Sequence, residues 1–311
     1  MENIKPSFSE LFEQIINFPD PQMQQRLNLL VGLDRTKETL QKMLALLIDP
    51  LGIKEWTEKH HRGANSILSF VTRRPPLIIL AGDVGSGKSE LATTIGDVVA
   101  RKHDLDVTLY PLSLSTRGQG RVGQMTQLIS SAFEYTLERA KKLKSESAKS
   151  KGAVILLIDE ADALAQSREN SQMHHEDKAG VNAFIRGIDS LGNGKLPAAV
   201  IMCTNRPNAL DPAIKRRAAE IIYFGRPSDL ERFQVLEQPL TELSFTSEQI
   251  NRIVELTGAQ NGKEYGCTFS DLVQRLLPSF VLDAYPDKPV DPDRAIEIAK
   301  DFIPTAPFKE S

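Results

Sequence analysis

The stretch Gly82-Asp83-Val84-Gly85-Ser86-Gly87-Lys88-Ser89 decides how the rest of the chain can be interpreted. It matches the pattern G-x-x-x-x-G-K-[ST], and it lies between an apolar run at 77–80 and a segment with helical spacing at 89–101. The glycines of such a loop let backbone N–H groups turn inward at the N-terminus of a helix, where anions bind. A chance match in a chain of this length has a probability of about 1%. The stretch therefore predicts a phosphate-binding loop.

The ligand that this loop predicts is a nucleotide. Lys88 would supply positive charge to the β and γ phosphates, and the Ser89 hydroxyl would ligate Mg²⁺. ATP or GTP with Mg²⁺ is therefore the implied ligand. The loop residues expected to bind it are Gly82, Val84, Gly85, Ser86, Gly87, Lys88 and Ser89.

A later apolar run, 153–158, ends in two adjacent carboxylates, Asp159 and Glu160. A neighbouring strand would deliver this pair beside the phosphates. Asp159 is expected to orient the Mg²⁺ shell with Ser89, and Glu160 to polarise a water for attack on the γ-phosphate. A strand that ends in Asp-Glu is by itself equally consistent with a turn. Together with the phosphate loop it favours hydrolysis, since a small-molecule kinase would not require Glu160.

Two further groups follow the next apolar run, 198–203. Asn205 stands at the strand end, where its amide could hydrogen-bond the γ-phosphate and the attacking water; the alternative is an Asn-x-Pro turn. The segment 210–217 starts as a capped short helix and ends in Arg216 and Arg217. Arginines at a helix C-terminus also interact favourably with the helix dipole, so a structural role for the pair stays open.

The organisation of the chain predicts an α/β fold. Continuous apolar runs alternate with helical segments, as in a parallel sheet covered by helices on both faces, and at least five strands are expected. The expected strands are 77–80, 107–112, 154–158, 198–203 and 221–224, and the helices between them are 89–101, 122–144, 178–191 and 212–218.

Only helical spacing follows the Gly-Arg-Pro at 225–227, which predicts a small all-helical second domain. Its expected helices are 229–236, 247–256, 269–284 and 294–302. Ahead of the sheet, short helices are expected at 8–18, 22–30 and 35–47. The predicted domains are a short helical N-terminal segment (1–30), a large α/β domain (31–226) and a helical lid (227–311).

Composition excludes several other classes. The 311 residues have 41% apolar and 25% charged side chains and a formal net charge of −3, so the general positive field of nucleic-acid-binding proteins is missing. Cys203 and Cys267 do not have the spacing of a disulfide framework or a zinc site. The first 20 residues lack a basic start followed by an apolar run, so no signal peptide is expected, and no apolar run is long enough to span a bilayer. A cytoplasmic protein without a membrane partner is expected. The basic stretch 139–151 carries no aromatic rings and indicates a solvated helix end.

Together, these motifs resemble the AAA+ ATPases: phosphate loop, Asp-Glu strand, Asn205, the Leu-Asp-Pro-Ala helix, the arginine pair and a helical lid, covering about 31–278. The resemblance implies ATP as nucleotide and a ring, usually a homohexamer. It implies that an arginine reaches into the neighbouring subunit's site, with Arg217 the first choice and Arg216 the second. It also implies that adenine binds near Val31, Gly32 and Leu33.

A narrower resemblance rests on residues 177–189 and 217–228, which look like those of the pachytene-checkpoint ATPases. Those enzymes remodel HORMA-domain proteins by pulling their N-termini through the ring pore. About 30 residues precede the ATPase region, as in the compact bacterial version that is associated with HORMA-regulated nucleotidyltransferases in antiphage defence. Where the family places a lid arginine, this sequence has Ser270 and Asp271, and Arg275 follows one turn later.

The glycine-rich segment 118–123 matches the dinucleotide pattern G-x-G-x-x-G, but no acidic strand end follows at the required distance. Its position matches instead the first pore loop of AAA+ rings. Arg121 and Val122 are expected to contact the substrate there, in place of the aromatic residue of most unfoldases. The segment 168–177 is interpreted as a second pore loop rather than a metal site, since its adjacent His and acidic residues point in different directions.

The predicted function is that of an ATP-hydrolysing ring that partially unfolds a HORMA-domain protein. One alternative is a DNA-associated clamp-loader or helicase-loader ATPase, which would share nearly every motif. The near-balanced charge argues modestly against it. The other is a scaffold that binds ATP without turnover, against which Glu160, Asn205 and the arginine pair argue.

Overall fold

The computed structural model describes residues 8–12, 14–114, 124–145, 150–164, 175–193, 196–259 and 263–307. The chain forms two compact units. The first comprises Met1–Leu27, Arg35–Ala81 and Ser89–Tyr223, and the second comprises Asn28–Asp34, Gly82–Lys88 and Phe224–Ser311. The phosphate loop therefore groups with the C-terminal helices, although it lies in the middle of the sequence.

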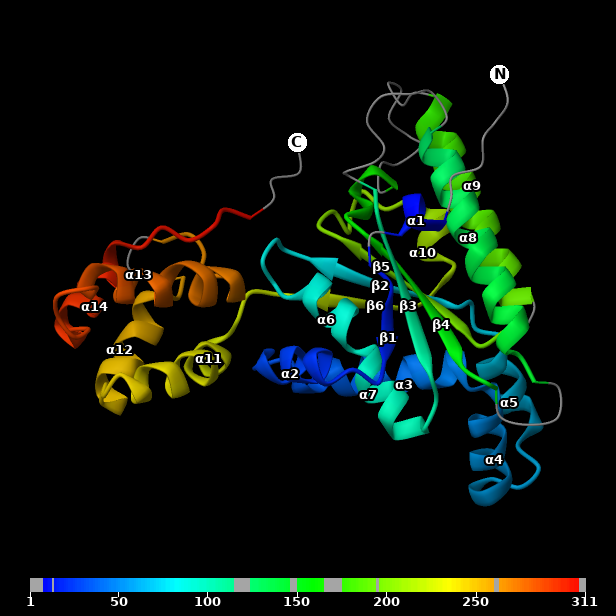
Figure 1. Ribbon diagram of the computed structural model, residues 1–311, viewed down its shortest axis with the longest axis horizontal. Helices are drawn as coiled ribbons and strands as arrows, with labels where there is room; N and C mark the ends of the chain where they lie inside the picture. The colour runs from blue at the N-terminus through cyan, green and yellow to red at the C-terminus, as the bar shows by residue number, and fades with distance from the viewer. Residues whose placement is uncertain are drawn as a thin grey trace. The chain divides into compact units, whose positions relative to one another are not determined.

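The first unit is built on a six-stranded sheet in the order β1-β3-β4-β5-β2-β6 (Figure 1). The pairs β2–β5, β5–β4 and β4–β3 are parallel, so the carboxyl ends of these strands lie on one edge of the sheet. The strands are β1 (Ile16–Phe18), β2 (Leu77–Gly82), β3 (Val107–Ser113), β4 (Ala153–Asp159), β5 (Ala198–Thr204) and β6 (Ala218–Phe224). This confirms the α/β fold and all five expected strands.

The sixth strand, β1, adds to the minimum of five expected strands, and it corrects the expectations of a purely parallel sheet and of a helix over 8–18. The helix α1 (Phe8–Leu11) ends early, and β1 pairs antiparallel with β3. Ile16 and Phe18 are buried while Asn17 is exposed, which is the alternation of a strand. The Phe18 ring packs against α7, where a Cβ added to Gly96 would lie 2.4 Å from the ring, so only glycine allows this approach.

Helices cover both faces of the sheet. On one face, α8 (Gln124–Leu143) and α9 (His175–Asn193) pack against alternate strand residues, with Phe133 and Phe184 in an edge-to-face contact at 5.6 Å. On the other side lie α3 (Asp34–Ile48), α6 (Lys88–Thr94) and α7 (Gly96–His103) (Figure 1). The interiors of β2, β4 and β5 are almost completely buried, which explains their continuous apolar runs, whereas Glu220 and Tyr223 of β6 are exposed.

Shorter helices complete this unit. Asp49 accepts a hydrogen bond from the Gly52 amide and caps a helix that sequence spacing did not predict. The remaining helices are α2 (Pro21–Leu29), α4 (Pro50–His60), α5 (Asn65–Thr72), the 3₁₀ helix η1 (Ala161–Leu164) and α10 (Pro212–Lys215).

The second unit contains the predicted all-helical part. Two of its helices start with complete capping boxes, Ser228 with Glu231 and Thr246 with Gln249. Its helices are α11 (Asp229–Glu242), α12 (Ser247–Leu256), a π-helical segment η2 (Asp271–Leu276) that continues into α13 (Leu277–Ala284), and α14 (Pro292–Asp301). They enclose a separate apolar core that includes Leu236, Ile253, Leu272, Leu276 and Phe280.

Candidate nucleotide-binding site

The phosphate loop has the backbone that its glycines predict. Gly85 and Gly87 have φ angles of 72° and 90°, in the left-handed region that favours glycine. Gly82 has φ 147°, and a Cβ there would lie 2.1 Å from the Phe224 carbonyl oxygen. The end of β2 can therefore lie against the end of β6 only with glycine at position 82.

Lys88 lies inside the loop, with 6% of its surface exposed. Its Nζ donates hydrogen bonds to the carbonyls of Gly82 (3.1 Å) and Asp83 (2.7 Å) and to Ser86 Oγ (3.3 Å). The Ser86 hydroxyl in turn donates to the Asp83 carbonyl at 2.8 Å. One positive charge is thus fixed at the centre of the loop, as binding of phosphate oxygens requires.

The segment that was expected to bind adenine lies beside this loop in the same unit. A Cβ added to Gly87 would lie 3.4 Å from Leu33 Cδ1. Gly32 has φ 80°, and a Cβ there would lie 3.1 Å from Glu231 Cγ and 3.4 Å from a Phe269 ring carbon. Val31 is 37% exposed and Leu33 is buried. Val31 and Gly32 are therefore placed between the phosphate loop and the helical part of the unit.

The two carboxylates lie at the carboxyl end of β4. Ser89, which directly follows Lys88 in the chain, donates from Oγ to Asp159 Oδ1 at 3.0 Å. The Glu160 amide donates to the same oxygen at 2.9 Å, and Glu160 has a left-handed φ of 52° with an exposed side chain. The serine hydroxyl and the carboxylate are hard oxygen ligands, so this pair fits Mg²⁺.

Asn205 is held by a residue that sequence analysis missed, Asp162. Asp162 Oδ1 accepts from the Asn205 amide (2.8 Å) and from Thr204 Oγ1 (2.7 Å), and its Oδ2 accepts from Asn205 Nδ2 (3.2 Å). The available signal was a third carboxylate in Asp159-Glu160-Ala161-Asp162. The 3₁₀ turn η1 directs this carboxylate to β5, which fixes both the backbone and the side chain of Asn205.

The two arginines at the end of α10 differ in their surroundings. Arg217 donates to both carboxylate oxygens of Asp189, from Nε at 2.7 Å and Nη2 at 3.0 Å, and this pairing raises its pKa. It also donates to the Ala213 carbonyl at 3.2 Å. Arg216 is exposed. These contacts tie Arg217 to α9 of its own chain rather than to Glu160 or Asn205.

Ser270 and Asp271, which stand where the resembling family places a lid arginine, lie close to the phosphate loop. The Ser270 amide donates to the Gly85 carbonyl at 3.0 Å. Asp271 is fully buried and accepts from the Thr268 amide at 3.0 Å and from Arg275 Nη1 at 2.6 Å. Arg275 also donates to the Ile303 carbonyl at 3.3 Å and lies over the Phe302 ring. Its guanidinium is thus bound to the C-terminal segment.

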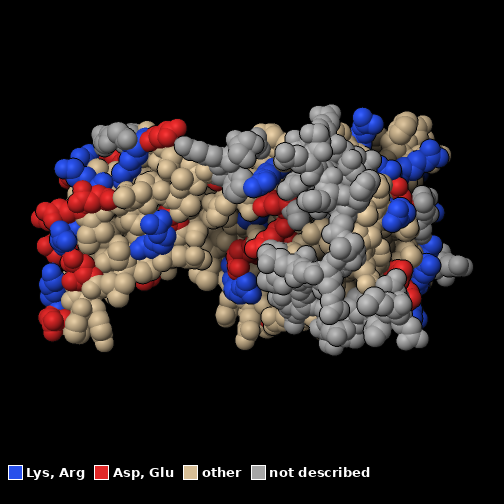
Figure 2. Space-filling model, turned by 90° about the horizontal axis from the view of Figure 1, so that it is seen from above, with Lys and Arg blue, Asp and Glu red and all other residues tan. Residues whose placement is uncertain are grey.

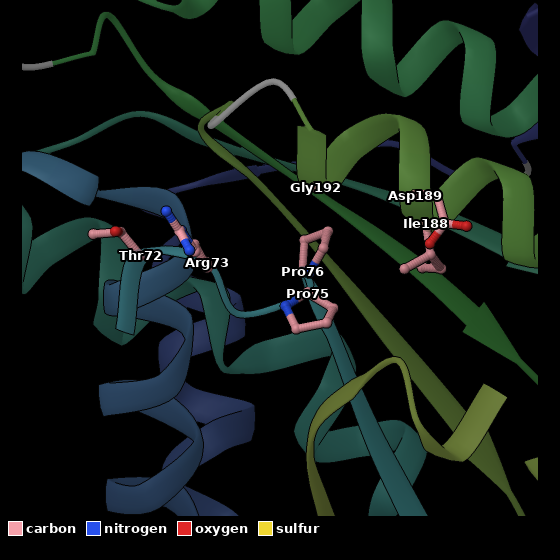
Figure 3. A pocket seen from close by; sticks show the side chains of 7 residues that line it. All are labelled: Thr72, Arg73, Pro75, Pro76, Ile188, Asp189 and Gly192. Carbon is pink, nitrogen blue, oxygen red and sulfur yellow. The ribbon is translucent and has the colours of Figure 1, made fainter. Parts of the chain in front are cut away.

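A separate cavity of about 300 Å³ lies in the first unit (Figure 3). Its lining includes Arg73 after α5, Pro75 and Pro76 before β2, and Asp189 and Gly192 on α9. Pro76 immediately precedes β2, and the phosphate loop follows the other end of that strand. The cavity is therefore distinct from the candidate nucleotide site.

The expected pore-loop residues Arg121 and Val122 lie outside the described residues, as does 168–174 of the second expected pore loop.

Within the part of the chain that the structure describes, no three His, Cys, Asp or Glu side chains gather into a metal cluster. No described helix has the length and apolar character needed to cross a membrane. On the face shown in Figure 2, basic and acidic side chains of the second unit are interspersed.

Comparison with known proteins places these features in a family. The model of the ATPase family associated with various cellular activities (AAA) matches residues 78–226. CD-NTase-associated protein 6 of Escherichia coli MS 115-1 is 60% identical over 306 residues, which cover 98% of each chain.

Two solved structures show the same similarity. One comes from the E. coli MS115-1 HORMA:CdnC:Trip13 complex: it is 58% identical, covers 98% of this chain and 100% of its own, and has a TM-score of 0.91. The other, Rhizobiales Trip13, is 53% identical over 95% of this chain and 100% of its own, with a TM-score of 0.75. The chain therefore belongs to the AAA family of ATPases, in the group of the CD-NTase-associated protein 6 sequences.

Proposed function

We propose that this chain hydrolyses ATP as a homohexameric ring and remodels a HORMA-domain protein by pulling it through the central pore. The HORMA-domain protein is associated with a nucleotidyltransferase, so that remodelling regulates a bacterial antiphage signalling system. The similarity to the solved HORMA:CdnC:Trip13 complex, at 58% identity over nearly the whole chain, supports this partner. In this proposal residues 31–226 act as the ATPase domain, 227–311 as its lid, and 1–30 lead into the ATPase domain.

The observation that carries the hydrolytic proposal is the 3.0 Å hydrogen bond between Ser89 and Asp159. It joins the last residue of the phosphate-loop motif to the carboxylate at the end of β4. These two side chains would hold Mg²⁺, which when bound neutralises charge on the β and γ phosphate oxygens. The loop amides and Lys88 would bind the same phosphates from the protein side.

Glu160 would accept the proton of the attacking water. Its exposed carboxylate follows Asp159 directly, and its left-handed φ of 52° turns the chain out of β4 at this residue. Such strained backbone in a non-glycine residue is often found at functional sites. Asn205, oriented by Asp162, would hydrogen-bond the γ-phosphate and the water.

Arg216 and Arg217 would act on the site of a neighbouring subunit. An arginine supplied in trans stabilises the charge that develops during phosphoryl transfer. The exposure of Arg216 supports that residue, whereas Arg217 would have to exchange Asp189 for the phosphate. Arg121 and Val122 would contact the substrate in the pore.

The hydrolytic role is tested by Glu160→Gln. Binding of ATP should persist because the loop and Lys88 are unchanged, while turnover should fall by about 10²- to 10⁴-fold because the base is lost. Binding is measured by titration with a fluorescent ATP analogue, and turnover by phosphate release. Glu248→Gln, which changes an exposed residue in the first turn of α12, is the matched control. Normal turnover in Glu160→Gln would contradict the assignment.

A further inference from the structure

Arg226, two residues beyond β6, binds three separate parts of the second unit. Its Nε donates to Asp83 Oδ2 at 2.8 Å, and its Nη2 lies 2.6 Å from the same oxygen. Its Nη1 donates to the Gly266 carbonyl at 2.6 Å, and Nη2 also donates to the Thr305 carbonyl at 2.7 Å. The guanidinium lies 4.8 Å from the centre of the Tyr265 ring. A lysine, with a single nitrogen, could not make this set of contacts.

Asp83 connects this arginine to the phosphate loop. Its carboxylate binds Arg226 and also accepts from the Val84 amide at 2.9 Å. Its carbonyl accepts from Lys88 Nζ and from Ser86 Oγ. The side chains of Asp83 and Arg226 are only 17% and 15% exposed. Any displacement of Asp83 therefore changes the hydrogen bonds that hold the Lys88 ammonium.

Thr305 connects the same arginine to the C-terminal segment, defined here as residues 302–307. The Thr305 amide and hydroxyl donate to the two oxygens of buried Asp271, at 3.0 and 2.7 Å. Asp271 belongs to the helix that begins beside the phosphate loop, where the Ser270 amide binds the Gly85 carbonyl. The C-terminal segment thus reaches the loop by two routes, through Arg226 to Asp83 and through Asp271 to Gly85.

We propose that Arg226 is a positioning residue that couples docking of the C-terminal segment to nucleotide binding by the phosphate loop. This rests on the proposed nucleotide site. The Arg226–Asp83 pair restricts the loop to the conformation with Lys88 at its centre, which reduces the ordering that binding requires. Because coupling between two binding equilibria is reciprocal, nucleotide must also stabilise the docked C-terminal segment.

The test compares ADP and ATP binding in variants of the full chain. In Arg226→Gln and in Arg226→Lys the dissociation constant should rise about tenfold, as is typical for coupled sites. Deletion of 303–311 should weaken binding in the same direction. In the Asp83→Asn background, Arg226→Gln should raise the dissociation constant little further, because both substitutions break the same Arg226–Asp83 pair. Arg252→Gln, which removes an exposed pair with Glu255 in the same unit, is the matched control and should leave affinity unchanged.

Hydrogen exchange separates positioning from a general loss of structure. ADP should slow amide exchange in residues 303–307 of the wild type, and this protection should be lost in Arg226→Gln while α11 and α12 remain protected. Unchanged affinity in both Arg226 variants, or nucleotide protection that persists without Arg226, would overturn the proposal. If the wild type bound no nucleotide, the proposed function would fail, whereas loss of coupling alone would leave wild-type binding and Glu160-dependent turnover intact.

Discussion

Asp162 shows how much of the candidate site depends on a side chain that would not touch the nucleotide. It binds the amide and side chain of Asn205 and the hydroxyl of Thr204, so it fixes the end of β5. A carboxylate that accepts several hydrogen bonds forms stronger interactions than a neutral acceptor. Asn205 is consequently oriented before any ligand binds, which lowers the reorganisation needed in the transition state.

Replacement of Asp162 by Ala should lower the ATPase turnover number about 10-fold or more, because the Asn205 amide loses its orientation. The affinity for ATP should change little, since the phosphate loop is unaffected. Phosphate release at saturating ATP measures turnover, and titration with a fluorescent ATP analogue measures affinity. Asp283→Ala, which removes exposed ion pairs on α13, is the control. A loss of affinity with normal turnover would contradict this role.

Gly82 and Gly225 give a matched pair for the close approach between β2 and β6. A Cβ on Gly82 would lie 2.1 Å from a backbone oxygen, whereas a Cβ on Gly225 meets nothing within 4 Å. Gly82→Ala should therefore cost about 3 kcal/mol or more of unfolding free energy, and Gly225→Ala within about 0.5 kcal/mol. Urea unfolding measures both. Equal stability of the two variants would show that the strand ends separate at little cost.

Among the secondary-structure elements of the helical unit, η2 carries a buried residue, Asp271, that stabilises the unit. Burial alone would raise the pKa of Asp271, but hydrogen bonds from the Thr305 side chain, the Thr268 and Thr305 amides and Arg275 outweigh it and lower the pKa below the ordinary 3.8. A lowered pKa means that the ionised form stabilises the folded state. This stabilisation is complete above the ordinary pKa and is lost as the pH falls through the folded value.

Asp271→Asn should therefore destabilise the protein at neutral pH by about 1–3 kcal/mol, because buried donors lose their charged acceptor. The difference between variant and wild type should shrink as the pH falls below about 4. Thermal unfolding followed between pH 3 and 8 measures it. Asp293→Asn, on the exposed first turn of α14, serves as the control. A difference that stays constant with pH would exclude ionised Asp271 as the source.

The elements that sequence analysis predicted are those with strong local signals. The four parallel strands β2, β3, β4 and β5 carry continuous apolar runs because both faces are covered, and the glycine spacing of the phosphate loop is fixed by its backbone angles. The strand β1 has only three residues, too few to distinguish a period of 2 from a helical period. Helix α4 had a usable start signal, Asp49 before Pro50, that periodicity alone does not capture. The Asp162 contacts join residues 42 and 43 positions apart, which no local pattern reveals.

For the whole molecule, the candidate residues belong to two different compact units. The loop residues 82–88 group with the helical unit, and Ser89, Asp159, Glu160 and Asn205 with the sheet unit. The interspersed charges on the face in Figure 2 fit a protein substrate better than a nucleic acid.

Remodelling of a HORMA-domain protein by ATP hydrolysis is tested most directly by the ATPase rate of the purified protein with and without a candidate HORMA-domain protein. Plasmid DNA and single-stranded DNA serve as comparisons, and Glu160→Gln shows that the measured rate belongs to this site. We expect that the HORMA-domain protein alone stimulates hydrolysis. Stimulation by DNA alone would contradict it and place the chain with the clamp-loader and helicase-loader ATPases.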